Sequence, residues 1–358
     1  MIIRDLEFQL IRVPNEWGYA RDRLVLVRLI FDGDLEGWGE AALPWRITEP
    51  GPRREFLLPI LAGRNVFDIA ELLELEPLYP RALKAAVETA CWDALGRATG
   101  QPIARLLGGV YRQRIPCAVH LHSEDPEELE AETRRAIEAG HASLLLAASG
   151  YVEHDLRRLK TVLAAAGPHA GIRFNANGLF DLPSAMRLAR ELEAFESVLI
   201  IDPLRRAGWD LYYQLHRGVD VPIAAHRQIT GPADVFAAAR AAAVDHVIVE
   251  PARVGGILRA RDCVTVAEAA NLGCSLNCPI SAGIQSAALL QLASALPALT
   301  VAHDTPPPDA FHASAVRGLK MTDGMFEVPL GPGLGVEIDR EGIDGLAVAR
   351  DVDDLFPQ

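Results

Sequence analysis

Six polar residues recur at a nearly constant interval in the second half of the chain, and their types could move protons or bind a ligand. Between 24 and 27 residues separate each one from the next. Each follows a short apolar run and precedes a loop and then a helical pattern. Such repetition is typical of β-loop-α units, which gather polar groups at the carboxyl ends of parallel strands, where barrel enzymes hold their active sites. The six are Asn175, Asp202, His226, Glu250, Asn277 and His303.

His226 and Glu250 are suited to acid–base chemistry without a metal. An unperturbed imidazole has a pKa of about 6.5, so it can take or give a proton at neutral pH, and a neighbouring carboxylate would orient it. We place His226, Glu250 and Asp202 as candidate catalytic residues. Asn175 and Asn177 are candidate donors to a developing negative charge. The alternative is a polar network that only fills the barrel mouth.

A second pattern, His120-Leu121-His122, ends the first strand of the repeating region. Strand alternation puts both imidazoles on one face. Together with His226 and a carboxylate from Asp202 or Asp304, they could bind zinc in the manner of some barrel hydrolases. The alternative is that both are ordinary hydrogen-bonded histidines.

The elements that would position these residues change character along the chain. Residues 1–42 show strand patterns, and 53–62, 66–75 and 81–98 show helical ones. Strands are then predicted near 115–121, 142–148, 171–175, 198–202, 222–226, 246–250, 274–277 and 299–303. Helices are predicted between them at 126–139, 153–166, 183–194, 209–217, 232–243, 256–272 and 283–295. Eight strands alternating with seven helices predict a closed barrel, and the tail 325–339 returns to strand.

Composition limits the classes of partner. The chain has 358 residues, half of them apolar, so it can bury the cores of about two domains. Its net charge of -13 argues against a nucleic acid or an anionic membrane surface. The chain contains no apolar run of the roughly 18 residues needed to span a membrane, and its five cysteines do not suggest a disulfide framework. It opens with no signal-peptide pattern, and we expect a cytoplasmic protein.

Five segments carry a resemblance to a known family: Gly37-Trp38-Gly39-Glu40, the helix 90–96, the stretch 106–109, Val254-Gly255-Gly256-Ile257 and the run 331–337. In this order they resemble the enolase superfamily, within it the muconate-lactonizing and mandelate-racemase-like branch. The resemblance implies an α+β capping domain plus a (β/α)7β modified TIM barrel. We expect the capping domain at 1–112, joined by 318–358, and the barrel at 113–317.

The resemblance also implies a chemistry from which this sequence departs. Family members remove a proton next to a carboxylate, with Mg2+ held by acids that end strands three, four and five. The corresponding residues here are Asn175, Ile201 and His226, which argue against Mg2+ bound in the family's usual way. We predict no other cofactor.

The family's catalytic lysines, on strands two and six, are also replaced. The lysine pair of strand two would fall at Leu145 and Ala147, and Glu250 stands at the strand-six position. The chain has only three lysines, all outside the predicted strand ends: Lys84, Lys160 and Lys320.

The function expected from this resemblance is that of an isomerase or lyase by ancestry, acting on a small carboxylated molecule and forming a homo-oligomer. Tyr19 and Arg46 lie in loops that would close over a substrate, and an arginine there could hold a carboxylate. The competing hypotheses are a non-catalytic small-ligand-binding or interaction protein, and a histidine-rich metal site with hydrolase-like chemistry. The candidate substrate-binding residues are Asn175, Asn177, His120, His122, Arg46, Tyr19, Ser281, His303 and Asp304.

Overall fold

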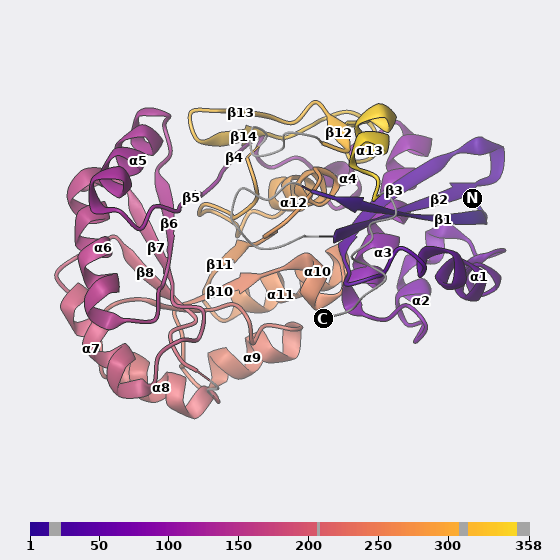
Figure 1. Cartoon of the computed structure of the whole chain (residues 1–358). Helices are drawn as coiled ribbons and strands as arrows, with labels where there is room; N and C mark the ends of the chain where they lie inside the picture. Colours follow the sequence, from indigo (N-terminus) through magenta and orange to yellow (C-terminus); the bar gives the residue numbers. More distant parts are fainter. Residues whose placement is uncertain (14–22, 206–207, 308–313, 349–358) are drawn as a thin grey trace.

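A computed structural model of the chain describes residues 1–13, 23–205, 208–307 and 314–348. A small antiparallel sheet with its helices lies beside a larger ring of parallel strands covered by helices (Figure 1). These two parts confirm the predicted fold class, an α+β capping domain joined to a barrel of parallel strands.

The capping sheet has the order β1-β2-β3, and all its neighbours are antiparallel. Helix α3 packs against β3 so closely that a Cβ atom on Gly37 or Gly39 would lie 1.9 Å from a carbonyl oxygen of α3. Only glycine permits this approach. The capping elements are β1 (Ile3–Arg12), β2 (Arg23–Phe31), β3 (Glu36–Ala42), α1 (Pro50–Leu61), α2 (Ile69–Leu73), α3 (Arg81–Thr99) and α4 (Ile103–Leu106).

The barrel contains a seven-stranded parallel sheet in the order β11-β10-β9-β8-β7-β6-β5. The predicted strand periodicity is therefore confirmed for seven of its eight members. The strands are β5 (Val119–Leu121), β6 (Ser143–Ala147), β7 (Gly171–Asn175), β8 (Val198–Ile201), β9 (Ile223–Ala225), β10 (His246–Val249) and β11 (Gly273–Leu276).

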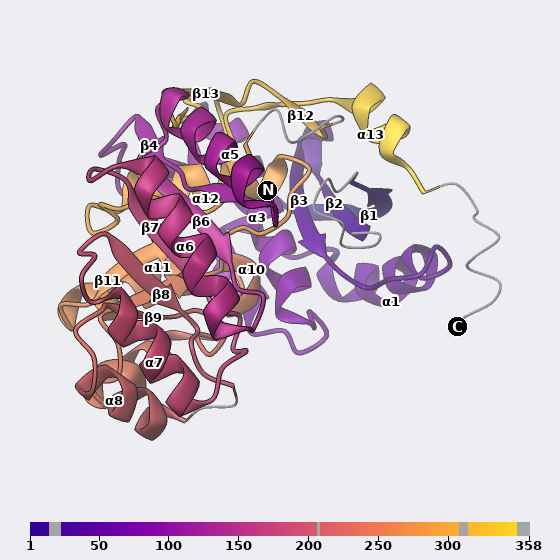
Figure 2. The same ribbon diagram turned by 60° about the vertical axis from the view of Figure 1, so that its left-hand side comes forward.

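Helices alternate with these strands, and α5, α6, α7 and α8 follow one another along the outer side of the sheet (Figure 2). Polar caps fix where some of them begin: the carboxylate of Asp125 accepts from the amides of Glu127 and Glu128, and that of Asp181 from Ser184. The helices are α5 (Pro126–Glu138), α6 (Val152–Ala166), α7 (Leu182–Leu192), α8 (Trp209–Arg217), α9 (Pro232–Arg240), α10 (Pro251–Val254), α11 (Ile257–Ala269) and α12 (Ile284–Ala295).

The prediction of an eighth strand near 299–303 is wrong, because no regular strand forms there. The ring of strands nevertheless closes at this point. Residues 303 and 304 make isolated parallel bridges, His303 to Cys117 on one side and Asp304 to Asn277 on the other. The amide of His303 donates to the carbonyl of Pro116, and the amide of Asp304 donates to that of Leu276. Two residues are too few for a regular strand, yet they join both edges of the seven-stranded sheet.

Some side chains on the inward face of the barrel are apolar, and they form a cluster separate from the main hydrophobic core. Ile201, Ala224 and Ile248 form a small buried cluster of their own, while the outward residues of the strands pack against the helices in the main core. Because side chains alternate along a strand, this cluster identifies which residues of β8, β9 and β10 point inward.

The C-terminal segment contacts both the capping sheet and strand β4, and the predicted domain bounds stay a prediction. Strand β14 pairs with β4, Ala347 bridges to Ile11, and Arg340 forms an ion pair with Glu36. The sequence reading missed the helix α13 in this segment. The elements are β4 (Arg114–Pro116), β12 (Val316–Arg317), β13 (Lys320–Thr322), β14 (Met325–Glu327), β15 (Glu337–Ile338) and α13 (Arg340–Leu346).

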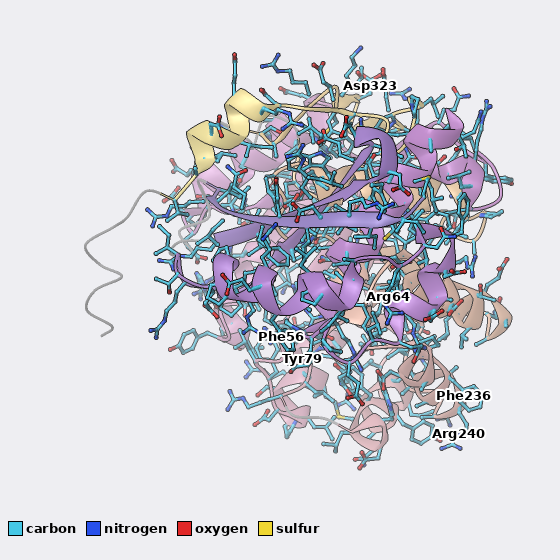
Figure 3. The ribbon with its side chains drawn as sticks, turned by 90° about the vertical axis from the view of Figure 1, so that its right-hand side faces the viewer. Phe56, Arg64, Tyr79, Phe236, Arg240 and Asp323 are labelled. Carbon is cyan, nitrogen blue, oxygen red and sulfur yellow. The ribbon has the colours of Figure 1, made fainter. Side chains whose placement is uncertain are left out.

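Within the described residues, no helix is both long enough and apolar enough to cross a membrane. Several aromatic side chains of the capping domain reach solvent, among them Phe56 with 57% of its surface exposed and Tyr79 with 75% (Figure 3). The expected homo-oligomer stays a prediction.

Candidate active site at the barrel mouth

Four of the six recurring residues share the inward face where the strands end. His226 and Glu250 come two residues after the inward-facing Ala224 and Ile248, so alternation turns them inward as well. Asn175 ends β7, and Asn277 follows β11. The carboxyl ends of these parallel strands thus present two amides, an imidazole and a carboxylate at one mouth.

His226 and Glu250 form an ion-pair contact across neighbouring strands. Nε2 of His226 lies 3.3 Å from Oε2 of Glu250, and both side chains are nearly buried. The contact does not have hydrogen-bond geometry, and Nε2 has no other hydrogen-bond partner among the described residues. Arg253 holds the same carboxylate, with its Nη2 2.6 Å from Oε2.

Electrostatics keep Glu250 ionised. Burial alone would raise its pKa, but His226 and Arg253 outweigh burial and hold the pKa below the ordinary 4.5. The carboxylate can therefore orient the imidazole and stabilise its protonated form.

A second histidine–carboxylate pair joins β5 to the closing segment. Nε2 of His120 lies 2.6 Å from Oδ1 of Asp304, and the other carboxylate oxygen accepts from Nδ2 of Asn277 at 2.6 Å. Burial would raise the pKa of Asp304, but His120, followed by Arg173 and His226, lowers it below 3.8. His120 is the more exposed member, with 23% of its side chain accessible against 6% for Asp304.

Arg173 lies beneath these pairs inside the barrel, and the sequence reading missed it. It is buried, and its guanidinium donates to the carbonyl of Ala302 and to the hydroxyl of Ser275. Its position two residues before Asn175 was the available signal, since alternation gives both residues the same face. A fixed cation here favours the ionised form of Asp304.

His303 belongs to this deeper layer and not to the mouth, which corrects its prediction as a substrate-binding residue. It is fully buried, and its Nδ1 accepts from the amide of Leu276 at 3.1 Å. Burial, and then the charge of Arg173, lowers the pKa of His303 to about 3, as it does for His246. Both imidazoles are neutral at physiological pH.

Asp202 does not join the candidate catalytic residues in space. Its buried carboxylate accepts from the amides of His226 at 2.8 Å and Arg227 at 3.0 Å, and its own φ is 46°. Inward-facing Ile201 precedes it, so alternation carries Asp202 to the other face. The catalytic role predicted for Asp202 is corrected to a positioning role, because its carboxylate holds the backbone that carries His226.

Asn175 and Asn177 form a tight turn after β7. Oδ1 of Asn175 accepts from the amide of Asn177 at 3.0 Å, and Asn177 has a φ of 53°. The carbonyl oxygen of Asn177 accepts from Nη1 of Arg227 at 2.7 Å. Arg227 thereby ties the ends of β7 and β9 together.

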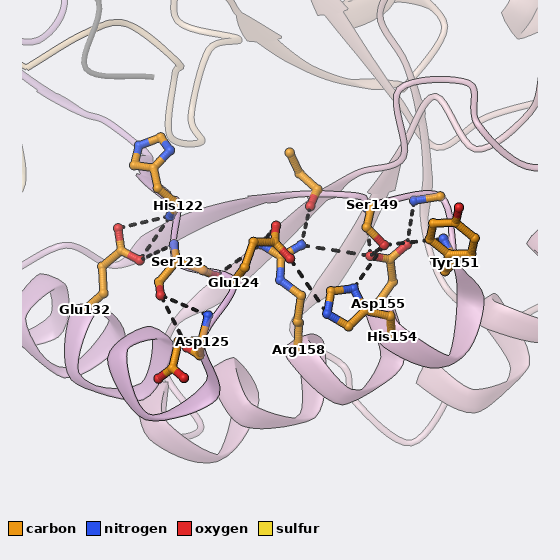
Figure 4. Close-up of polar contacts among 12 residues, drawn as sticks. His122, Ser123, Glu124, Asp125, Glu132, Ser149, Tyr151, His154, Asp155 and Arg158 are labelled. Atoms are coloured by element: carbon orange, nitrogen blue, oxygen red, sulfur yellow. Dashed lines mark hydrogen bonds and ion pairs between the residues drawn. The ribbon is translucent and has the colours of Figure 1, made fainter. Parts of the chain in front are cut away.

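Carboxylates of the following helices hold the loops after β5 and β6 (Figure 4). Glu132 of α5 accepts from the amides of His122 and Ser123, and Asp155 of α6 accepts from those of Ser149 and Gly150. The His122 ring stacks beside His120, with centroids 6.1 Å apart. The predicted common face of the two histidines is therefore confirmed.

Three further substrate-binding predictions have different outcomes. Ser281 is fully buried, and its hydroxyl donates to the carboxylate of Glu40 in the capping domain, so it is corrected to a structural residue. Arg46 is exposed in the loop before α1, where its amide donates to Glu49. Tyr19 lies outside the described residues.

The strand ends do not fit the Mg2+ that the resemblance implies. This ion prefers oxygen ligands in octahedral geometry, whereas Ile201 is apolar, His226 offers nitrogen, and the amide oxygen of Asn175 already accepts a backbone hydrogen bond. Across the described part of the chain, no group of three or more His, Cys, Asp or Glu side chains could hold a metal.

The alternative of a zinc site built by His120, His122 and His226 is also corrected. His120 on β5 is paired with Asp304, whereas His226 after β9 is paired with Glu250, and β5 and β9 are not neighbours in the sheet. The three lysines stand where predicted, in helices α3 and α6 and in strand β13, and not at the barrel mouth: Lys84, Lys160 and Lys320.

Two family models match the chain. The N-terminal domain of mandelate racemase / muconate lactonizing enzyme matches residues 18–108, and the enolase C-terminal domain-like model matches residues 128–342. Muconate cycloisomerase 1 of Rhodococcus opacus is 27% identical over 334 residues, covering 89% of this chain and 90% of that protein. L-Lys-D/L-Arg epimerase of Methylococcus capsulatus is 30% identical over 281 residues, covering 77% and 78%. The crystal structure of 2-chloromuconate cycloisomerase from Rhodococcus opacus 1CP has a TM-score of 0.88 at 25% identity, covering 98% of this chain and 100% of that one.

Proposed function

Because the chain belongs to the mandelate racemase and muconate lactonizing enzyme branch of the enolase superfamily, we propose that it is an isomerase or lyase acting on a small carboxylated molecule. Its relatives include proteins named as cycloisomerases, racemases and epimerases. The reaction we propose moves a proton to or from a carbon atom beside the carboxylate.

The pairing of His226 with Glu250 at the barrel mouth carries this proposal. Glu250 faces Nε2, which leaves Nδ1 of the same ring to exchange a proton with the substrate. The ionised Glu250 stabilises the imidazolium once it forms, and Arg253 keeps the carboxylate in place. Asn175 and Asn177 are the proposed donors to the negative charge that develops on the substrate, and no step is assigned to a metal.

Exchange of a carbon-bound proton for deuterium in D2O, followed by NMR, tests the proposal. The acids to test are N-succinyl amino acids, the dipeptide L-Ala-L-Glu and muconate, since proteins named for these compounds are among the relatives. We expect His226→Ala to lower the exchange rate by at least about 100-fold, the usual contribution of a general base.

A matched control is available in His216, whose Nε2 lies 2.9 Å from Oδ1 of Asp245. This pair has the same chemistry but lies at the opposite ends of the strands, because Asp245 precedes β10. His216→Ala should keep the exchange rate of the wild type. An equal loss in both variants, or an unchanged rate in His226→Ala, would contradict the proposal.

A non-catalytic ligand-binding protein is the second candidate. It is favoured by the extent to which Asp202 and Asn175 already satisfy backbone amides, which leaves fewer groups for chemistry. Binding of one of the tested acids, seen by calorimetry, without proton exchange in the wild-type protein would support this candidate over the enzyme.

A further inference from the structure

A groove lies between helices α5 and α6, outside the ring of strands. Figure 2 shows these two helices next to each other on the outer side of the barrel, and they pack against one another. The groove encloses about 550 Å3, within the range of roughly 300–1,000 Å3 that is usual for small-molecule sites. It extends from Pro126 to Arg134 along α5, a helical rise of about 12 Å. An elongated small molecule would therefore fit it.

The groove offers apolar surface to a ligand. Leu129 and Pro126 of α5 line it on one side, and Ala164 and Ala165 of α6 line it on the other. Leu129 is fully buried, whereas Pro126 and Ala164 are exposed to solvent. Removing apolar surface from water is favourable, so a ligand with an apolar body would gain by covering these residues.

One cation in the groove has no counter-charge. Four arginine and lysine side chains line the groove, and three of them form ion pairs with carboxylates at 2.7 to 3.3 Å. The fourth is Arg157, which is exposed and whose guanidinium forms no ion pair or hydrogen bond among the described residues. It is therefore free to bind an anionic group. The three pairs are Arg134 with Glu130, Arg158 with Glu124, and Lys160 with Glu191.

The neighbouring Arg158 gives the groove a fixed wall (Figure 4). Its side chain is 5% exposed. Its Nη1 donates to the carbonyl of Ala147 at 2.9 Å, and its Nη2 donates to that of Ser123 at 3.4 Å. Glu124 lies between Arg158 and the imidazole of His154, which also lines the groove. Because these contacts order the wall before a ligand arrives, binding has less conformational entropy to overcome.

We infer that the groove between α5 and α6 binds a small organic carboxylate, with its charged group at Arg157 and an apolar body over Pro126 and Ala164. This binding site is separate from the barrel mouth and goes beyond the proposed function. The net charge of the chain is -13, so most of its surface repels anions. An arginine without a carboxylate partner, beside exposed apolar surface, provides the complementary charge, and its planar guanidinium can hold a carboxylate through two hydrogen bonds.

Titration with para-trifluoromethylbenzoate, followed by fluorine NMR, tests this inference, and the neutral para-trifluoromethylbenzamide is the matched ligand. We expect the wild-type protein to bind the acid more tightly than the amide. Arg157→Met keeps an apolar stem and removes the charge, so it should weaken binding of the acid by about 10-fold, the effect of one hydrogen bond to a charged group. The affinity for the amide should change little.

The location of the bound acid has its own readout. His154 lines the groove, so the proton signals of its ring, assigned with His154→Gln, should shift as the acid is added. Arg240→Met is the control for the loss of an exposed arginine, because Arg240 lies on α9 (Figure 3). This variant should bind the acid as the wild type does.

A second variant blocks the groove without changing its charge. Ala164→Phe alters an exposed position of α6, and the added ring should fill the space that the ligand needs. We expect binding of both the acid and the amide to be lost, while the circular dichroism spectrum and the melting temperature stay those of the wild type.

Several results would overturn the inference and leave the proposed function untouched, since that function rests on proton exchange at the mouth. One is a wild-type protein that does not bind the acid, and another is unchanged binding in Arg157→Met. Loss of binding in His226→Ala would place the acid at the barrel mouth. A lower molecular mass for Ala164→Phe than for the wild type, measured by light scattering, would make the groove an interface between copies of the chain.

Discussion

The barrel mouth and the seam between the capping domain and the barrel both bury carboxylates, yet the two regions treat them in opposite ways. At the mouth, Asp304 and Glu250 face histidine and arginine side chains, and their pKa values are lowered. At the seam, burial raises the pKa of Glu40 and of Glu88 to about 7. The difference lies in the partners and not in the depth of burial.

The seam carboxylates meet neutral donors at the starts of barrel helices. Glu40 accepts from the amides of Ala282, Ile284 and Gln285 near the start of α12. Glu88 accepts from the amide of Leu258 in α11. Amide donors favour the ionised form, but in both cases burial outweighs them.

At the mouth the histidine and arginine partners of Asp304 and Glu250 outweigh burial, whereas at Glu40 and Glu88 burial prevails. A fixed charge suits proton transfer, in which an imidazolium must be stabilised each time it forms. A carboxylate that only joins two domains needs acceptors for their amides and can tolerate a variable charge.

The largest expected effect comes from separating β3 from α3, within the capping domain, with Gly39→Ala. The new Cβ would lie 1.9 Å from the carbonyl oxygen of Ala86, so β3 must move away from α3 and carry Glu40 with it. We expect the free energy of unfolding, measured in urea, to fall by on the order of 3 kcal/mol.

Gly51→Ala is the matched control for this change. It lies in α1, where a new Cβ would meet nothing within 4 Å, so stability should change little. Equal stability of the two variants would show that the close approach of β3 to α3 does not contribute to the stability of the capping domain or to the position of Glu40.

The next effect is a pH dependence that the two regions should show with opposite sign. The pKa of Glu40 is about 7 in the folded protein and ordinarily 4.5. Its contribution to stability is therefore fully present below pH 4.5, falls as pH rises and is lost above about pH 7. A shift of this size corresponds to at most about 3 kcal/mol.

Urea unfolding of the wild type and of Glu40→Gln between pH 4.5 and 8 measures this contribution. The stability advantage of the wild type should shrink as the pH rises, since glutamine does not titrate. Glu250→Gln is the comparison at the mouth. Because the pKa of Glu250 is lowered, its contribution is present above pH 4.5 and is lost only at lower pH. A constant difference for Glu40→Gln across this range would contradict the contrast between the regions.

The sequence could predict the fold because the periodic signal is local and repeated. The apolar runs alone predict that strands end near Asn175, His226 and Glu250. The alternation of side chains along a strand predicts that Ile201 points into the barrel. The closing segment failed as a strand because its pairing depends on two edges far away in the sequence, which no local pattern reports.

The site was less predictable because partners are chosen in three dimensions. The sequence placed His120 and Asp304 in one candidate site, but it did not predict that these two side chains, 184 positions apart, contact each other directly. Ser281 looked available for a ligand until Glu40 of the capping domain was found against it. Arg173 was missed because a charge in mid-strand gives no hint of the acid that it stabilises.

The smallest expected effect concerns a single donor at the seam. Nε1 of Trp92 donates to Oε1 of Glu88 at 3.1 Å, and Oε2 has no hydrogen-bond partner among the described residues. Trp92→Phe removes this donor, so the ionised carboxylate should lose part of what stabilises it. A hydrogen bond to a charged group contributes about 1.5–3 kcal/mol, and one to a neutral group about 1 kcal/mol.

A double-mutant cycle of Trp92→Phe and Glu88→Gln separates this contact from the packing change. We expect a coupling energy that is larger at pH 8, where Glu88 is mostly ionised, than at pH 5, where it is mostly protonated, given its pKa of about 7. A coupling energy that is the same at both pH values would mean that the charge of Glu88 does not vary in this range. The seam would then hold a permanently charged or a permanently neutral acid, and the contrast with the mouth would rest on Glu40 alone.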